Sequence, residues 1–293
     1  MKRVLLLMIA AACAATGCKK HNGGEIPPDK QYLPVNVSFS VETKAAGNSF
    51  EDGDCVGLYM VYGGTLQSNG NYSDNQKYSF NSGVWSTDKQ IYWKDETTKA
   101  DFYCYHPYRE VCNPTSFSFR IATDQSSVGE YKASDLLWGK SASVSPTKET
   151  ISVSMRHLMS CVEIALKPGT GFTEEWFSTA EKSVYISNVK NETNINMSTG
   201  TVTVQGESST VKCLKDGEKY KAIIAPQTVS ADAELLVIEI GGVKYTSKNE
   251  FTFKPGTCHS FTITVDKVNG NFSFTIEDWI TDSDEHSFTV NNN

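Results

Sequence analysis

Apolar and polar residues alternate with a period of two along most of this 293-residue chain. Within residues 35–42, Val35, Val37, Phe39 and Val41 fall on one face, and the residues between them are polar or charged. Successive side chains of a β-strand point to opposite faces of its sheet, so this alternation is typical of a strand that is buried on one side. Residues 35–42 are therefore predicted to form a half-buried strand.

Similar short runs recur along the chain and are separated by turn residues. They predict further strands at residues 56–62, 90–93, 101–105, 117–121, 151–155, 161–166, 184–189, 202–204, 222–224, 235–240, 251–253, 261–265, 272–276 and 288–290. One helical turn is expected, at residues 173–179. Many short strands at regular spacing are typical of β-sandwiches, so the predicted fold class is all-β. A sandwich takes about 100 residues, and two fit in tandem in this chain.

The first 17 residues have the pattern of a bacterial lipoprotein signal peptide. Lys2 and Arg3 precede an apolar run at residues 4–12, and small residues then lead to Cys18. The run is too short to cross a bilayer as a helix. Residues 1–17 are therefore predicted to be cleaved off, and Cys18 to carry the acyl chains that hold the mature protein on the outer membrane.

The residues after the signal peptide divide into three expected parts. Residues 18–34 are rich in Lys, Gly and Pro, have little apolar content and are expected to form a tether. The stretch at residues 141–148, which contains Pro146, is the best candidate boundary within the body. We therefore expect an N-terminal domain at residues 35–147 and a C-terminal domain at residues 148–293.

The charge of the chain bears on its partners. The formal net charge is −7, and it becomes −9 when Lys2 and Arg3 leave with the signal peptide. Nucleic-acid binding needs a basic surface, so the composition argues against a nucleic-acid partner.

Six cysteines remain in the body of the protein: Cys55, Cys104, Cys112, Cys161, Cys213 and Cys258. An exported protein can form disulfides, and six cysteines allow fifteen pairings. Several of these cysteines lie inside apolar strand patterns, so buried free thiols are an equal expectation. Cys104 and Cys112 are the pair to test first, because a hairpin could bring them together.

No set of residues predicts a catalytic or metal-binding centre. Cys104 and His106 could share a strand face as metal ligands, but no further ligand pair has matching spacing. Trp85, Tyr92 and Trp93 could stack on sugar rings, although sandwich cores use tryptophan equally well. We therefore predict no enzyme, no metal and no cofactor, and we keep a monomeric glycan-binding surface lipoprotein as an alternative function.

Five segments in order carry a resemblance that covers residues 35–290. They are residues 50–59 (FEDGDCVGLY), residues 91–93 (IYW) with 101–108 (DFYCYHPY), residues 135–137 (DLL) with 153–162 (VSMRHLMSCV), residues 225–227 (APQ) with 253–256 (FKPG), and residues 276–279 (IEDW). Together they resemble the fimbrillin (Mfa-like) family of Bacteroidales surface lipoproteins. Cys161 stands where the family usually has a lysine.

The resemblance implies a fold and a role. The implied fold is two transthyretin-like β-sandwich domains, and the implied role is a stalk, anchor or tip subunit of a type V pilus on the cell surface. The expected partners are other pilus subunits, the outer membrane through the lipid anchor, and a host or bacterial surface ligand. Which of the three positions in the pilus the chain takes stays open.

The resemblance also implies how a stalk subunit would mature. Members of the family are cut after a basic residue that follows the first strand, and Lys44 followed by Ala45 fills that position, where the family often has arginine. The cut would remove the strand that carries Val35, Val37, Phe39 and Val41. A strand of a neighbouring subunit could then replace it, and the candidate donor is the C-terminal tail with Phe288 and Val290 on one face.

Overall fold

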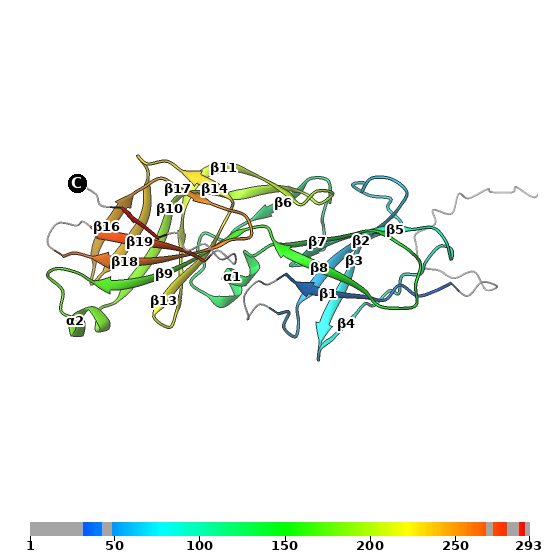
Figure 1. Cartoon of the computed structure of the whole chain (residues 1–293), viewed down its shortest axis with the longest axis horizontal. Coiled ribbons are helices and arrows are strands. Elements are labelled where there is room, and N and C mark those ends of the chain that lie inside the picture. Colours follow the sequence, from blue (N-terminus) through cyan, green and yellow to red (C-terminus); the bar gives the residue numbers. More distant parts are fainter. Residues whose placement is uncertain (1–31, 43–48, 268–271, 280–286, 291–293) are drawn as a thin grey trace, which may run out of the picture.

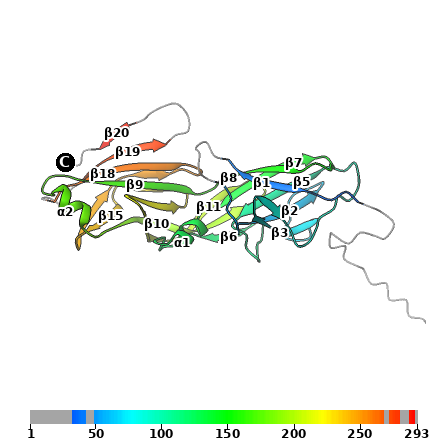
Figure 2. The same cartoon turned by 90° about the horizontal axis from the view of Figure 1, so that it is seen from below.

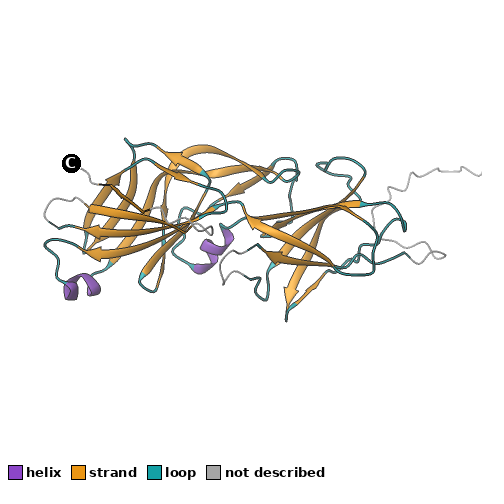
Figure 3. Ribbon diagram, in the orientation of Figure 1, coloured by secondary structure: helices purple, strands orange, loops and turns teal. Residues whose placement is uncertain are grey.

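The structure, a computed structural model, describes residues 32–42, 49–267, 272–279 and 287–290. These residues form an elongated molecule in which two groups of strands lie one after the other along the long axis (Figures 1 and 2). Strands dominate, and the two described helices are each six residues long (Figure 3). The prediction of an all-β fold is confirmed. Neither of the described helices has the length and apolar character that crossing a membrane requires.

The first group is a seven-stranded sheet in the order β1-β8-β7-β5-β2-β3-β4. Its strands are β1 (Val37–Val41), β8 (Ile151–His157), β7 (Leu137–Val144), β5 (Ala100–His106), β2 (Cys55–Tyr62), β3 (Ser73–Asn81) and β4 (Val84–Ser86). Strand β1 runs parallel to β8, and the other pairs are antiparallel. The two end strands, β1 and β4, contact each other, so the sheet curls around its inner face. We call the buried residues that pack together on that side of the sheet the N-terminal core; they include Phe39, Leu58, Trp93, Phe102 and Val153.

The second group contains two larger sheets and one small one. One has the order β11-β10-β15-β16 with β6 also paired to β10; a second has the order β12-β13-β9-β18-β19-β20; and β14 pairs with β17. The strands are β6 (Phe117–Arg120), β9 (Ser160–Pro168), β10 (Lys182–Asn196), β11 (Thr201–Lys212), β12 (Leu214–Asp216), β13 (Lys219–Ile224), β14 (Gln227–Val229), β15 (Glu234–Ile240), β16 (Val243–Lys248), β17 (Phe251–Phe253), β18 (Cys258–Val265), β19 (Phe272–Trp279) and β20 (Ser287–Val290). Apolar side chains from all three sheets form the sandwich core, which includes Val162, Ile186, Ile238, Phe253 and Ile263.

A third apolar cluster, which we call the junction core, joins the two groups. It combines Tyr59 and Tyr103, on the outer face of the seven-stranded sheet, with Phe117 of β6, Ile195 of β10 and Ile223 of β13. Apolar burial contributes about 25 cal/mol per Å². A contact of this kind between two parts of a chain opposes their relative motion, because separating them would expose the apolar side chains.

Trp138 of β7 extends this contact to the hairpin between β10 and β11. Its indole N–H donates to the Met197 carbonyl at 2.7 Å. Gly200 has a φ of +67°, and a Cβ atom there would lie 2.7 Å from the Trp138 ring. Glycine therefore serves two needs at this position, the left-handed backbone and the close approach of the ring.

Sheet membership does not follow the chain order at the middle of the sequence. Strand β8 follows residue 147 but pairs with β7 and β1, whereas β6 precedes residue 147 and pairs with β10. The division of the chain into domains at residues 147 and 148 stays a prediction.

Local patterns forecast several elements and missed others. The expected helical turn is α2 (Glu174–Thr179), which begins after Thr173, whose side chain accepts a hydrogen bond from the Trp176 N–H. The predicted strand at 235–240 is β15, which pairs antiparallel with β16. Residues 90–93 were expected to be a strand, but they contribute an isolated bridge from Tyr92 to Pro34. Helix α1 (Val128–Ala133), which Ser127 caps, was not expected.

Candidate strand-exchange site

Strand β1 occupies one edge of the seven-stranded sheet. Its residues pair in register with β8, from Val37 opposite Ile151 to Val41 opposite Met155. The pairing continues past the strand ends, since the Ile151 N–H donates to the Asn36 carbonyl at 2.9 Å and the Glu42 N–H donates to the Met155 carbonyl at 2.7 Å. The ladder to β8 therefore extends from Asn36 to Glu42, which is all of the predicted strand 35–42 except Val35.

The residues before β1 are held by a second segment, residues 90–93. The Val35 N–H donates to the Ile91 carbonyl and the Trp93 N–H donates to the Leu33 carbonyl, both at 2.9 Å. The Gln90 side-chain amide also donates to the Val35 carbonyl at 2.9 Å. Residues 90–93, which were predicted to form a strand, therefore bind the residues that precede β1.

The alternate side chains of the first strand fill the N-terminal core. Val35 is 1% exposed, and Val37 and Phe39 are each 6% exposed. The Phe39 ring meets Trp85 of β4 edge to face at 4.8 Å, and the Trp85 indole N–H donates to the Phe39 carbonyl at 3.2 Å. Each such side chain contributes about 1.5–3 kcal/mol on burial. The three together contribute about 5–9 kcal/mol, comparable with the whole stability of an ordinary domain.

Several predicted site residues lie outside the described residues. The lipidation site Cys18 precedes them, and Lys44 and Ala45 fall in the gap at 43–48. On either side of this gap, the described chain ends at Glu42 and resumes at Ser49. The cleavage site and the lipid anchor therefore stay predictions.

The candidate donor segment is strand β20, which lies at an edge of the six-stranded sheet. It pairs antiparallel with β19, with Phe288 opposite Ile276 and Val290 opposite Phe274. Figure 2 shows β20 in the group of strands at one end of the molecule and β1 in the group at the other end. Both β1 and β20 have a single neighbouring ladder, so each can be removed without separating two other strands.

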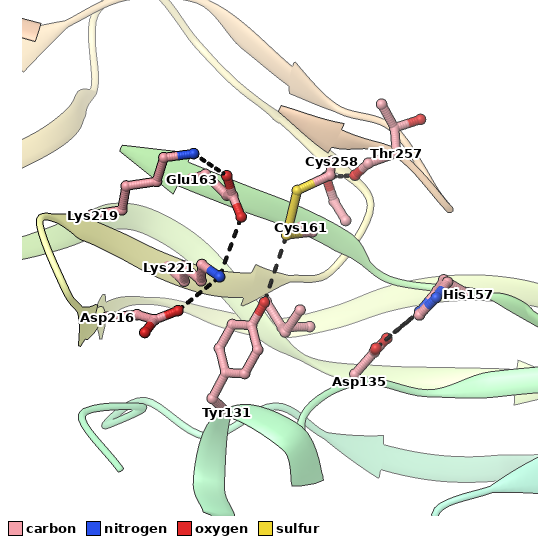
Figure 4. The surroundings of a disulfide bond; sticks show 12 residues. Tyr131, Asp135, His157, Cys161, Glu163, Asp216, Lys219, Lys221, Thr257 and Cys258 are labelled. Carbon is pink, nitrogen blue, oxygen red and sulfur yellow. Dashed lines mark hydrogen bonds and ion pairs between the residues drawn. A yellow bond between two sulfur atoms is a disulfide. The ribbon is translucent and has the colours of Figure 1, made fainter. Parts of the chain in front are cut away.

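The described cysteines form one disulfide, between Cys161 of β9 and Cys258 of β18, which are 97 residues apart (Figure 4). These two strands pair in parallel with Cys161 directly opposite Cys258. Cys104 and Cys112 are both free, so the pair that we put first does not form in the structure. Cys104 faces the N-terminal core, whereas Cys112 packs against the junction core, on the other side of the sheet.

We expect the double substitution of Cys161 and Cys258 by serine to lower the free energy of unfolding by about 2–4 kcal/mol, because the bond closes a long loop in the unfolded chain. Denaturant unfolding would measure the change, with Cys55→Ser as the control because Cys55 is free. Alkylation of the denatured protein should find two more reactive thiols after reduction than before it. An equal number in both samples would contradict the bond.

His157, at the end of β8, forms an ion pair with Asp135, which follows α1 (Figure 4). The His157 Nδ1 atom lies 2.9 Å from one Asp135 carboxylate oxygen and 3.0 Å from the other. Burial alone would lower the pKa of His157, but the hydrogen bond and the negative charge of Asp135 outweigh it and raise the pKa above its usual value of 6.5. The pair ties the segment after α1 to the last residue of β8.

This raised pKa predicts a pH dependence of stability. A group whose pKa is raised on folding stabilises the folded state fully below its unfolded pKa, and that contribution is lost as pH rises through the folded pKa. The difference in melting temperature between wild type and Asp135→Asn should therefore be largest below about pH 6.5 and should shrink as the pH rises above it. Asp88→Asn, at an exposed turn, is the control. Parallel curves for wild type and Asp135→Asn would contradict the assignment.

The geometry around Cys104 and His106 is that of packing residues. Cys104 is fully buried, and the His106 Nδ1 atom lies 3.0 Å from the Cys55 carbonyl oxygen. Within the described part of the chain, no three His, Cys, Asp or Glu side chains gather as metal ligands would.

Of the three aromatic residues that could have stacked on sugars, Trp85 and Trp93 take part in the N-terminal core, and Tyr92 is half-buried. Trp93 is 1% exposed and meets Phe102 edge to face. Trp85 lies among Phe39, Phe50 and Phe80. These two tryptophans pack in the core beneath β1. They do not form an exposed aromatic surface on which a sugar could stack.

Two glutamine side chains bind the backbone N–H and carbonyl of a strand residue, as a neighbouring strand would. The sequence did not reveal either role. The fully buried Gln125 accepts from the Ile223 N–H through Oε1 and donates from Nε2 to the Ile223 carbonyl, each at 2.8 Å. Gln227 accepts from the Lys190 N–H at 2.8 Å and donates to the Lys190 carbonyl at 2.9 Å. Lys190 lies between the part of β10 that pairs with β15 and the part that pairs with β6. Gln227 lies in the Ala-Pro-Gln segment of the resemblance, which was the available signal; Gln125 lies in no motif.

Comparison with known proteins places this geometry in a family. The profile of the fimbrillin-like family matches residues 43–279. A candidate fimbrium subunit of Bacteroides uniformis, Fim1C, is 25% identical over 296 residues, covering 95% of each chain.

Solved structures share the fold. A candidate cell adhesion protein from Bacteroides uniformis superposes with a TM-score of 0.65 at 24% identity, and one from Bacteroides ovatus with a TM-score of 0.68 at 17% identity. Each comparison covers 87% of this chain and the whole of the other. Since the family profile spans most of the sequence and the fold agrees, this chain belongs to the fimbrillin-like family.

Proposed function

We propose that this protein is a structural or adhesive subunit of a pilus on the bacterial cell surface and that it assembles with other subunits by exchange of its first strand. The proposal contains no catalytic step. The observation that carries it is the placement of β1, an edge strand with alternate side chains buried in the N-terminal core. Its family membership supports the same role.

The physical step is strand replacement. A cut after Lys44 would separate the first strand and the lipid tether from the rest of the body. If β1 left, β8 would expose the backbone groups that now pair with it, and the N-terminal core would lose Val35, Val37 and Phe39. Such an open edge is a template for another strand, which backbone hydrogen bonds hold and side-chain pockets place in register.

The donor in this proposal is β20 of a neighbouring subunit. Donor and acceptor lie in different groups of strands along the long axis (Figure 2), so each subunit would insert into the next. A head-to-tail contact of this kind does not close on itself and builds a filament. The two groups of strands would act as the two sandwich domains, with the lipid on Cys18 delivering the subunit to the outer membrane.

Limited trypsin digestion followed by size-exclusion chromatography tests this function. We expect cleavage after Lys44 and growth of oligomers, and we expect deletion of residues 285–293 to block growth but not cleavage. Lys44→Gln is the matched control and should stay intact and monomeric. Clean cleavage at Lys44 with a body that stays monomeric would reject strand exchange and leave a terminal or accessory role in the pilus.

The lipid anchor has a separate test. Cys18→Ser should release the protein from the membrane fraction and abolish incorporation of labelled palmitate. A variant that still fractionates with membranes would contradict lipidation at this residue.

A further inference from the structure

The outer face of the β11-β10-β15-β16 sheet is hollowed. On β10, Val184 and Ile186 point into the sandwich core, so Tyr185 and Ser187 point the other way. The hollow has a volume of about 420 Å³, within the range of ligand sites in proteins. Its floor is formed by Ser187 and Val237, which are 5% and 7% exposed.

Two β-bulges shape this hollow. The register between β10 and β11 shifts between Ile186 and Val189, and that between β15 and β16 shifts between Glu234 and Leu236. At the first bulge Asn188 has a φ of +58°, and its side-chain amide donates to the Glu234 carbonyl at 2.8 Å. Bulges re-aim side chains and are frequent beside functional sites. Here the two bulges lie on either side of the ladder in which Tyr185 of β10 pairs with Val237 of β15, and the hollow lies over this ladder.

The wall of the hollow carries hydrogen-bonding groups of both kinds. The Tyr185 hydroxyl donates to a Glu239 carboxylate oxygen at 3.3 Å, and the Lys244 ammonium lies 3.6 Å from a Glu234 carboxylate oxygen. The hydroxyl oxygen of Ser187, on the floor, lies 3.2 Å from that of the exposed Thr210. The hollow therefore offers two carboxylates, one ammonium group, hydroxyls and one half-buried phenol ring.

We propose that this hollow, which we call the outer-face groove, binds a neutral saccharide. Adjacent sugar hydroxyls donate to carboxylates and accept from an ammonium group, and the apolar face of a sugar ring packs against an aromatic ring. The two carboxylates outnumber the single lysine, which disfavours an anionic sugar. The groove lies away from β1 and β20, so the proposal goes beyond assembly and does not depend on it.

Titration calorimetry of the purified protein with the neutral probes N-acetylglucosamine, galactose, mannose and their oligosaccharides tests this proposal. We expect at least one neutral probe to bind. Tyr185→Ala and Glu239→Gln should each weaken that binding about tenfold or more, which corresponds to about 1.4 kcal/mol. Matched controls are Tyr108→Ala and Glu218→Gln, which lie outside the groove and should leave binding unchanged. Unchanged melting temperatures would show that the variants fold.

Three results would overturn the proposal. They are no binding by any neutral probe, binding that the Tyr185 and Glu239 variants do not weaken, and preferential binding of the anionic probe N-acetylneuraminic acid. Because strand exchange is read out by oligomer growth after trypsin, a failure here is distinguishable from a failure of the assembly proposal.

Discussion

Replacing Gln125 by leucine is expected to destabilise the folded protein by about 2–6 kcal/mol. Leucine has nearly the same size but cannot form the two hydrogen bonds that the Gln125 amide makes with the Ile223 backbone. Both backbone groups would then be buried without a partner, and each such group costs about 1–3 kcal/mol. The loss should appear in chemical denaturation as a lower midpoint with an unchanged slope.

The position of Gln125 explains why this cost is large. The residue lies between β6 and α1, and its own N–H donates to the Lys212 carbonyl at 3.0 Å. It therefore holds one connecting segment against both β11 and β13, beside the junction core. Strand β12 pairs with residues 219–221 of β13. At Ile223, two residues further along β13, the Gln125 side chain makes the hydrogen bonds that a neighbouring strand would make.

An exposed glutamine supplies the control for this experiment. Gln67 donates to Thr65 within a surface turn, so Gln67→Leu should change the unfolding free energy by less than about 0.5 kcal/mol. Equal effects at the two positions would contradict the assignment of Gln125 as a ladder partner. A Gln125→Glu variant should also be destabilised, because the carboxylate cannot donate to the Ile223 carbonyl.

Local patterns predicted the elements of this fold better than their pairing. The alternation at Val35 to Val41 forecast a buried strand, and the helical turn expected at residues 173–179 is α2. Nothing local tells that Val37 pairs in parallel with Ile151, more than one hundred residues later. The register between distant strands depends on the packing of the whole sheet, so it cannot be predicted from the local pattern of one sequence.

The same reasoning applies to the cysteines. Cys161 and Cys258 are neighbours because β9 and β18 pair in parallel, and that pairing is non-local. The cysteine at position 161, where the family usually has lysine, indicated a changed environment. It did not predict which other cysteine would form the disulfide. Cys104 and Cys112 were close in sequence, yet the sheet of β5 separates their side chains.

Removal of residues 19–44 is expected to abolish stable folding of the monomer, and a synthetic peptide of residues 33–44 added in trans is expected to restore it. The missing strand takes away three side chains of the N-terminal core, the ladder to β8 and the contacts with residues 90–93. The lost apolar burial alone, about 5–9 kcal/mol, is as large as the stability of a typical domain. Recovery of the near-ultraviolet circular dichroism signal on adding the peptide would measure the rescue.

A peptide with Val37, Phe39 and Val41 replaced by serine is the matched control. It keeps the backbone groups that pair with β8 but cannot fill the N-terminal core, so it should not rescue folding. Rescue by both peptides would show that backbone pairing alone holds the strand. A truncated chain that stays folded and monomeric without peptide would contradict the view that β1 completes the core. In that case removal of β1 would leave no open groove beside β8 for a strand of another subunit.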